Sequence, residues 1–308
     1  MSDEVLDGFV TLFRGRGDCW GAWSGGCVRE PLTKELFRDH LYGDTPIGVY
    51  PAIPLGTRTQ CVWGCTDIDK EESPEKAIAI YEALAAVDVT SWIERSENGW
   101  HVWVFATQLV EAVHMRNMLL AAHQVAGVPA REVNPKQSHL SIGQVGNYVR
   151  LPYPKHLLGS SRVVMEFDGD GLGGPGGHLV PLSDFVSRAL LWRETPQVIE
   201  HWASYYKPPP EPEHIIAAPS EDMAQAASRL PALGRIIFRD GPRPEGDRSL
   251  TLLRLAHHCH EAGLAPEDCL LLLEDADLRW GKFMIRGASG ERELHKLVAK
   301  VYGVTPSS

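Results

Sequence analysis

The run TQCVWGCTDID, residues 59–69, constrains the fold of this chain more than any other segment. Its valine, tryptophan, cysteine and threonine residues suit a buried β-strand. Two aspartates, Asp67 and Asp69, nevertheless stand at the end of the run, separated by one residue. The fold must therefore contain a core strand whose last residues carry two like charges. These charges must either reach solvent or be compensated by a positive group.

Strand-like and helix-like segments alternate after this run. The helix in residues 73–87 is expected to begin at Ser73, because serine is a good N-cap and the following proline fits the first helical position. The expected strands are TSWIERS (90–96), GWHVWVFA (99–106), AREVNPKQ (130–137), GNYVRLPY (146–153) and RVVMEFDGDG (162–171), and the expected helices are SPEKAIAIYEALAAV (73–87) and LVEAVHMRNMLLAAHQVAG (109–127). This order predicts an α+β fold in which helices cover one face of a mixed sheet.

The segment KPPPEPEHIIAAPSED, residues 207–222, has four prolines among its first six residues and reads as a semi-rigid linker. Beyond it, RSLTLLRLAHHCHEAG, APEDCLLLLEDADLRW and SGERELHKLVAKVYG have helical periodicity. We therefore expect a first domain at 1–205, a linker at 206–223 and a small all-α domain at 224–308.

Charge and composition narrow the class of protein. The chain has 308 residues with 40 acidic and 30 basic side chains, a net charge of −10, which argues against a protein that coats nucleic acid nonspecifically. No apolar run is long enough for a membrane span, and the acidic N-terminus does not resemble a signal peptide. The six scattered cysteines show no paired zinc motif, so we expect reduced thiols, no zinc and a cytoplasmic protein without a membrane partner.

Asp67 and Asp69 are the first candidate site. Residues at i and i+2 of a strand point to the same face, so the two carboxylates repel unless a cation lies between them. Mg²⁺ or Mn²⁺ is the expected partner, because hard cations prefer carboxylate oxygen. The alternative is a strand that simply runs into a solvated, charged loop at Lys70 and Glu71.

A second group of residues suits phosphate. Arg95 and Ser96 end one strand, and His101 lies in the next, so an arginine, a hydroxyl and an imidazole are expected close together. Each also has a purely structural interpretation, as a packed histidine or a solvated charge. Further charged candidates follow in the same domain, namely Glu132, Lys136, Arg150, Lys155 and His156.

Carboxylates for metal and donors for a triphosphate together indicate a phosphoryl-transfer site. Two metals about 4 Å apart can clamp an attacking and a leaving oxygen, and catalysis is then mainly positioning and charge neutralisation. The chain has no Walker A loop, which disfavours a P-loop NTPase.

The ordered motifs TDID, RSENGWHVWVF, REVNPKQ and GNYVRLPYPKH resemble the archaeo-eukaryotic primase superfamily. They look most like the primase domain of TOTE conflict systems and related phage primase-polymerases. The segments LFRGRGDCWGAW and HLYGDTPIGVYPAIP resemble the entry part of that group, so the resemblance covers roughly residues 10 to 165. It implies a modified RNA-recognition-type sheet joined to an N-terminal αβ unit.

The resemblance also implies roles for single residues. Asp67 and Asp69 match the metal-binding motif, and Ser96 and His101 match the motif that contacts the phosphates of the incoming nucleotide. Glu132 sits where the family has its last acidic ligand, with Asp168 in MEFDGDG as the rival. The strand beside the nucleotide corresponds to Asn147 and Arg150. Candidate contacts to nucleic acid are Lys155, His156, Arg243 and Arg248.

The implied activity is a template-dependent DNA primase-polymerase that uses NTPs or dNTPs on single-stranded DNA, with a two-metal Mg²⁺ or Mn²⁺ site. Its setting would be phage or mobile-element replication in the host cytoplasm, with a separate helicase as a possible partner. Two alternatives stay open: a noncatalytic nucleic-acid-binding replication or defence factor, and a metal-dependent nuclease. Dependence on nucleoside triphosphates separates the first expectation from the nuclease.

Overall fold

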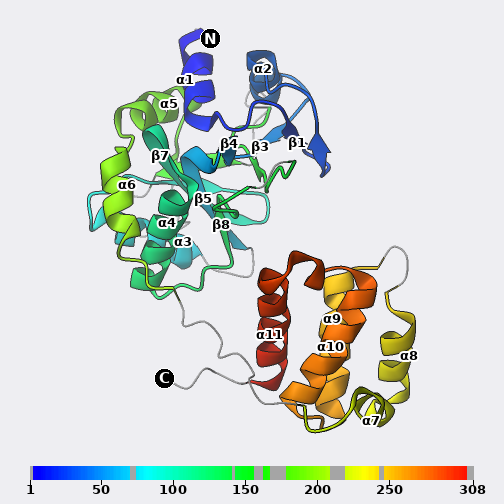
Figure 1. The fold of residues 1–308 in the computed structure, drawn as a ribbon. Helices are drawn as coiled ribbons and strands as arrows, with labels where there is room; N and C mark the ends of the chain where they lie inside the picture. The colour runs from blue at the N-terminus through cyan, green and yellow to red at the C-terminus, as the bar shows by residue number, and fades with distance from the viewer. Residues whose placement is uncertain are drawn as a thin grey trace. The chain divides into compact units, whose positions relative to one another are not determined.

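The protein divides into two compact units, Met1–Lys207 and Pro208–Ser308 (Figure 1). The computed structural model describes residues 3–69, 74–140, 143–155, 162–166, 178–208, 219–242 and 246–303. The α+β fold expected from the sequence is confirmed: the first unit combines helices with antiparallel sheets, and the described part of the second unit is helical.

The larger sheet of the first unit has seven strands in the order β11-β10-β6-β7-β5-β4, with β8 also paired to β5. Their bounds are β4 Ile53–Leu55, β5 Arg58–Asp69, β6 Trp92–Arg95, β7 Gly99–Glu111, β8 Glu132–Asn134, β10 Val163–Glu166 and β11 His178–Leu179. β4 pairs with the beginning of β5 and β8 with its end, on the edge opposite β7. The long strand predicted at 59–69 is thus the centre of the sheet, and its acidic end lies between β7 and β8.

Helices cover both faces of this sheet. On β7, Val102 and Val104 face α3 (Pro74–Ala85), α4 (Ala112–Ala126) and α6 (Pro196–Ala203). The alternate residues Trp103 and Phe105 face α1 (Asp3–Phe13) and α5 (Leu182–Leu191), where the ring of Phe13 meets both edge-on. The expectation of helices on one face is therefore wrong, because apolar side chains on both faces of a strand require cover on both.

A second sheet of four short strands, in the order β2-β1-β3-β9, lies beside the larger one (Figure 1). Its members are β1 Trp20–Ala22, β2 Cys27–Val28, β3 Ile47–Val49 and β9 Val149–Arg150. β9 belongs to the segment GNYVRLPY but pairs with β3 from the N-terminal part of the chain. This pairing carries Tyr148 and Arg150 from the middle of the sequence onto the N-terminal sheet.

His40 of α2 (Lys34–Tyr42) connects this helix by hydrogen bonds to β3 and to the segment that follows β9. The side chain is fully buried; its Nδ1 accepts the N–H of Ile47 at 3.1 Å, and its Nε2 donates to the carbonyl oxygen of Pro152 at 2.9 Å. An Nδ1 that accepts an amide hydrogen carries no proton, so the ring is neutral. Burial lowers the pKa of His40 to about 4.

Acid should therefore destabilise the protein through His40. Its pKa of about 4 in the folded state lies below the unfolded value of about 6.5, so the unfolded chain binds the extra proton first. Stability is constant above about pH 6.5 on this account and falls by up to about 3 kcal/mol as the pH drops toward 4. Urea unfolding at pH 7 and pH 4.5 measures this loss of stability, with the His40→Gln variant as the control. Equal losses in both proteins would contradict the assignment.

The second unit contains the three helices expected from the sequence. They are α9 (Arg248–Glu261), α10 (Pro266–Trp280) and α11 (Ala288–Tyr302). Two shorter helices, α7 (Met223–Arg229) and α8 (Ala232–Asp240), and the 3₁₀ turn η2 (Met284–Arg286) accompany them. The buried carboxylate of Asp277 accepts the N–H groups of Lys282, Phe283 and Met284, and so fixes the turn after α10. Among the described residues, no helix combines the length and the hydropathy that crossing a bilayer requires.

Candidate active site

One row of ionisable side chains crosses the larger sheet at the end of β5. In the strand register, Asp67 lies opposite Glu132 of β8 on one side and His101 of β7 on the other, and His101 in turn lies opposite Glu94 of β6. Directly opposed residues of antiparallel strands share a face and have Cβ atoms about 5 Å apart. Four neighbouring strands therefore contribute one titratable group each to a single line.

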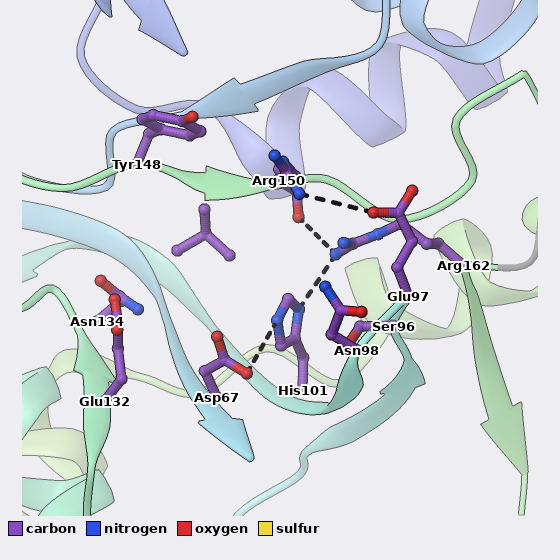
Figure 2. Close-up of a pocket in the computed structure, with 11 residues that line it drawn as sticks. Asp67, Ser96, Glu97, Asn98, His101, Glu132, Asn134, Tyr148, Arg150 and Arg162 are labelled. Atoms are coloured by element: carbon purple, nitrogen blue, oxygen red, sulfur yellow. Dashed lines mark hydrogen bonds and ion pairs between the residues drawn. The ribbon is translucent and has the colours of Figure 1, made fainter. Parts of the chain in front are cut away.

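A cavity of about 290 Å³ opens above this row (Figure 2). Its floor consists of Asp67, His101, Glu132 and Asn134; the hairpin between β6 and β7 adds Ser96, Glu97 and Asn98. The second sheet supplies the opposite wall with Tyr148, Val149 and Arg150, and Arg162 closes one side. The site thus lies between the two sheets, and neither sheet alone forms it.

Glu94 is buried beneath the floor with three partners. Its Oε2 accepts from Nδ1 of His101 at 2.8 Å and from the indole N–H of Trp103 at 2.8 Å, and its Oε1 lies 2.7 Å from the Arg162 guanidinium. Burial acts to raise the pKa of Glu94, but the Arg162 and His101 charges outweigh it, and the pKa is lowered. Glu94 is thus an ionised carboxylate in the protein interior.

His101 is a cation at neutral pH. Burial acts to lower its pKa, but Glu94 at Nδ1 and Asp67, 3.5 Å from Nε2, raise it to about 9. Asp67 responds in the opposite sense: burial favours a higher pKa, but the hydrogen bond to His101 lowers the pKa below its ordinary value. The floor therefore carries an imidazolium beside ionised Asp67.

Two arginines add positive charge at the same end of the cavity. Arg162 donates to the carbonyl oxygen of Arg150 at 3.0 Å, and Arg150 donates to that of Trp23 at 2.6 Å. Both guanidinium carbons lie over the Trp23 ring, 5.0 and 5.4 Å from its centre, which orients the two groups by cation–π attraction. Glu97 lies 3.6 Å from Arg150. Figure 2 shows the arginines and His101 on one side of the cavity, with Glu132 and Asn134 on the other.

The structure brings together five of the residues selected from the sequence: Asp67, Ser96, His101, Glu132 and Arg150 all line the cavity. Other candidates lie beside or away from it. Lys136 has its Nζ 3.9 Å from a carboxylate oxygen of Glu132. Asn147 exchanges two hydrogen bonds with Gln137. Arg95 lies opposite Trp100 in the register, one position from the Glu94–His101 pair, so its side chain leaves from the other face of the sheet.

The remaining candidates lie elsewhere or outside the described residues. Lys155 is paired with Asp44 at 2.9 Å. Arg248 donates to the carbonyl oxygens of Trp280 and Gly281 at the end of α10. The side chain of Asp69 and the residues His156, Asp168 and Arg243 lie outside the described part of the chain. Within that part, no group of three His, Cys, Asp or Glu side chains is arranged to hold a metal ion.

Sequence reasoning missed seven residues of the site: Glu94, Glu97, Asn98, Asn134, Tyr148, Val149 and Arg162. One signal was available for Glu94. It stands inside the apolar strand TSWIERS, where a charge at a core position requires a buried partner. That partner, Arg162, is 68 positions away in sequence and is identified only by the pairing of β10 with β6.

Comparison with protein families agrees with these motifs. Residues 27–165 match the model of the archaeo-eukaryotic primase domain of TOTE conflict systems, and every residue that lines the cavity lies inside the match. A search of curated proteins finds no match to the chain. The resemblance seen in the sequence is thereby confirmed for residues 27–165, which are similar to the archaeo-eukaryotic primase domain of TOTE conflict systems.

Proposed function

We propose that this protein is a template-dependent primase-polymerase that joins nucleotides by metal-assisted nucleotidyl transfer. The observation that carries the proposal is the strand register that places Asp67 opposite Glu132 and beside His101, with two arginines above them. Carboxylates at one end and fixed cations at the other suit a metal-bound triphosphate. The primase-type family of residues 27–165 supports the same reaction class.

The carboxylates fit a hard divalent cation. The side chains of Asp67 and Glu132 are 36% and 39% exposed, so their oxygens are open to the cavity rather than consumed by buried contacts. We propose that they hold Mg²⁺ or Mn²⁺, with Asp69 as the third ligand. When bound, the ions would polarise the phosphate and favour ionisation of the attacking 3′-hydroxyl.

The cationic residues act on the triphosphate. His101 donates from Nε2, and the Arg150 and Arg162 guanidinium groups face the same space (Figure 2). Because these charges are fixed before the nucleotide arrives, they neutralise the leaving pyrophosphate without reorganisation. Ser96, at the hairpin turn where its N–H donates to the Gly99 carbonyl oxygen at 2.9 Å, offers a hydroxyl at the same end.

The proposed substrates are NTPs or dNTPs on a single-stranded DNA template, in replication of a phage or mobile element within a host cytoplasm. A separate helicase would open the duplex. A nuclease built on the same carboxylates would have no need for three cations arranged to hold a triphosphate. That arrangement is the reason for preferring synthesis.

An end-labelled primer on a longer template tests the proposal. With Mg²⁺ or Mn²⁺ and nucleotides, we expect the label to move to longer products, and a chelator should stop the reaction. Conversion of the labelled primer to shorter fragments in the absence of nucleotides would instead identify a nuclease. Binding of the DNA with no change in length under any condition would favour a noncatalytic factor.

A further inference from the structure

Tyr148 forms an unusual wall of the cavity, because its ring lies flat on the backbone of two strands. Gly21 of β1 and Gly48 of β3 are direct partners in the register. A Cβ at either position would overlap the Tyr148 ring. Glycine is therefore required at both positions for the ring to approach the sheet so closely.

The ring is also held at its edge and at its hydroxyl. The Tyr148 hydroxyl donates to the carbonyl oxygen of Ala22 at 3.1 Å, and the ring of Tyr50 meets it at 63° with centres 5.5 Å apart. One face of the ring rests on the glycines, and Tyr148 lines the cavity with the other (Figure 2). A fixed aromatic face with its polar atom already satisfied is suited to apolar stacking.

The cavity has two chemically different ends. His101, Arg150 and Arg162 make one end cationic, whereas Tyr148, Asn134 and Glu132 lie at the other (Figure 2). Asn134 is 2% exposed, and its Oδ1 has no hydrogen-bond partner among the described residues. A buried amide oxygen without a partner is costly and calls for an explanation, and the side chain that carries it lines the cavity.

We propose that Tyr148 is the stacking surface for the nucleoside of the bound nucleotide, with the Asn134 amide as its hydrogen-bonding neighbour. This inference rests on the proposed function, which places the triphosphate at the cationic end. With the phosphates there, the nucleoside extends toward the aromatic end. Stacking of a base on an aromatic ring tolerates all bases, as a template-directed enzyme requires.

Binding of two probes separates the nucleoside from the phosphates. The wild-type protein and a Tyr148→Ala variant are titrated calorimetrically with a nucleoside triphosphate and with inorganic tripolyphosphate, each with Mg²⁺. We expect Tyr148→Ala to weaken nucleotide binding about tenfold and to leave tripolyphosphate binding unchanged. Tyr148→Phe, which keeps the ring, should bind both probes like the wild type.

A second variant displaces the Tyr148 ring by a substitution at the glycine on which the ring rests. Gly21→Ala adds a methyl group that meets only Tyr148 among its nearest atoms, so it should push the ring into the cavity and weaken nucleotide binding similarly. In the double variant Gly21→Ala/Tyr148→Ala the methyl group has room, and the loss should equal that of Tyr148→Ala alone. Thermal unfolding of each variant verifies that the protein is folded.

Three results would overturn the inference. Unchanged nucleotide binding in Tyr148→Ala would show that the ring contacts no nucleoside. Equal weakening of both probes would show that the ring only shapes the phosphate end. If the wild-type protein binds a nucleoside triphosphate no more tightly than it binds tripolyphosphate, the inference fails together with the proposed function. The first two results leave the proposed function intact.

Discussion

Replacement of Asp67 by asparagine should reduce nucleotide incorporation by about a thousandfold or more. Asp67 stands between Glu132 and His101 in the register, so it is the carboxylate that both the proposed metal and the imidazolium require. Loss of a metal ligand removes several kcal/mol of charge stabilisation, and each 1.4 kcal/mol is about tenfold in rate. Primer extension with the wild-type protein and the variant measures the effect.

The control for this variant is Asp44→Asn. Asp44 is 91% exposed, pairs only with Lys155 in the described structure and does not line the cavity, so its replacement should leave incorporation unchanged. Both variants should unfold at nearly the wild-type temperature. If Asp67→Asn retains wild-type activity, the row of carboxylates is not the catalytic centre.

Replacement of Glu94 by glutamine should lower the free energy of unfolding by about 3–5 kcal/mol. Glu94 is fully buried, and it is the counter-charge for both Arg162, whose side chain is 4% exposed, and His101. Glutamine preserves the shape but removes the charge, so the Arg162 guanidinium remains in the interior without its carboxylate partner, and His101 keeps only Asp67. Chemical denaturation at neutral pH gives the difference.

An ion pair on the surface serves as a control for the effect of burial on the stability loss of Glu94→Gln. Glu166 of β10 binds Arg188 at 2.7 Å, but both side chains are nearly half exposed. Exposed ion pairs contribute about 1 kcal/mol or less, so Glu166→Gln should hardly alter stability. If Glu94→Gln and Glu166→Gln cost the same, Glu94 does not have the central electrostatic role assigned to it.

The local sequence pattern was enough to predict the parts of the site that lie on β5 and on the hairpin between β6 and β7. Asp67, Ser96 and His101 stand at strand ends that periodicity and the Asn98-Gly99 turn identify, and the structure brings all three to the cavity. The same alternation explains why Arg95 leaves from the other face, although it is adjacent to Ser96. Strand period alone therefore separates Arg95 from the residues that line the cavity.

The rest of the site depends on pairings between distant segments. Arg162 meets Glu94 only because β10 pairs with β6, and Tyr148 joins the cavity only because β9 pairs with β3. The two glycines that receive the Tyr148 ring lie 100 residues or more before it in sequence. Register between segments this far apart is set by tertiary packing, which a single sequence does not reveal.

Synthesis on single-stranded DNA without a primer tests the central claim most directly. Template, labelled nucleotides and Mn²⁺ or Mg²⁺ are combined with the wild-type protein, and the products are sized on a gel beside a primed reaction. The claim predicts short new strands without the primer, extension with it, and loss of both in Asp67→Asn. Absence of incorporation in both reactions, with a folded protein that binds the template, would contradict it.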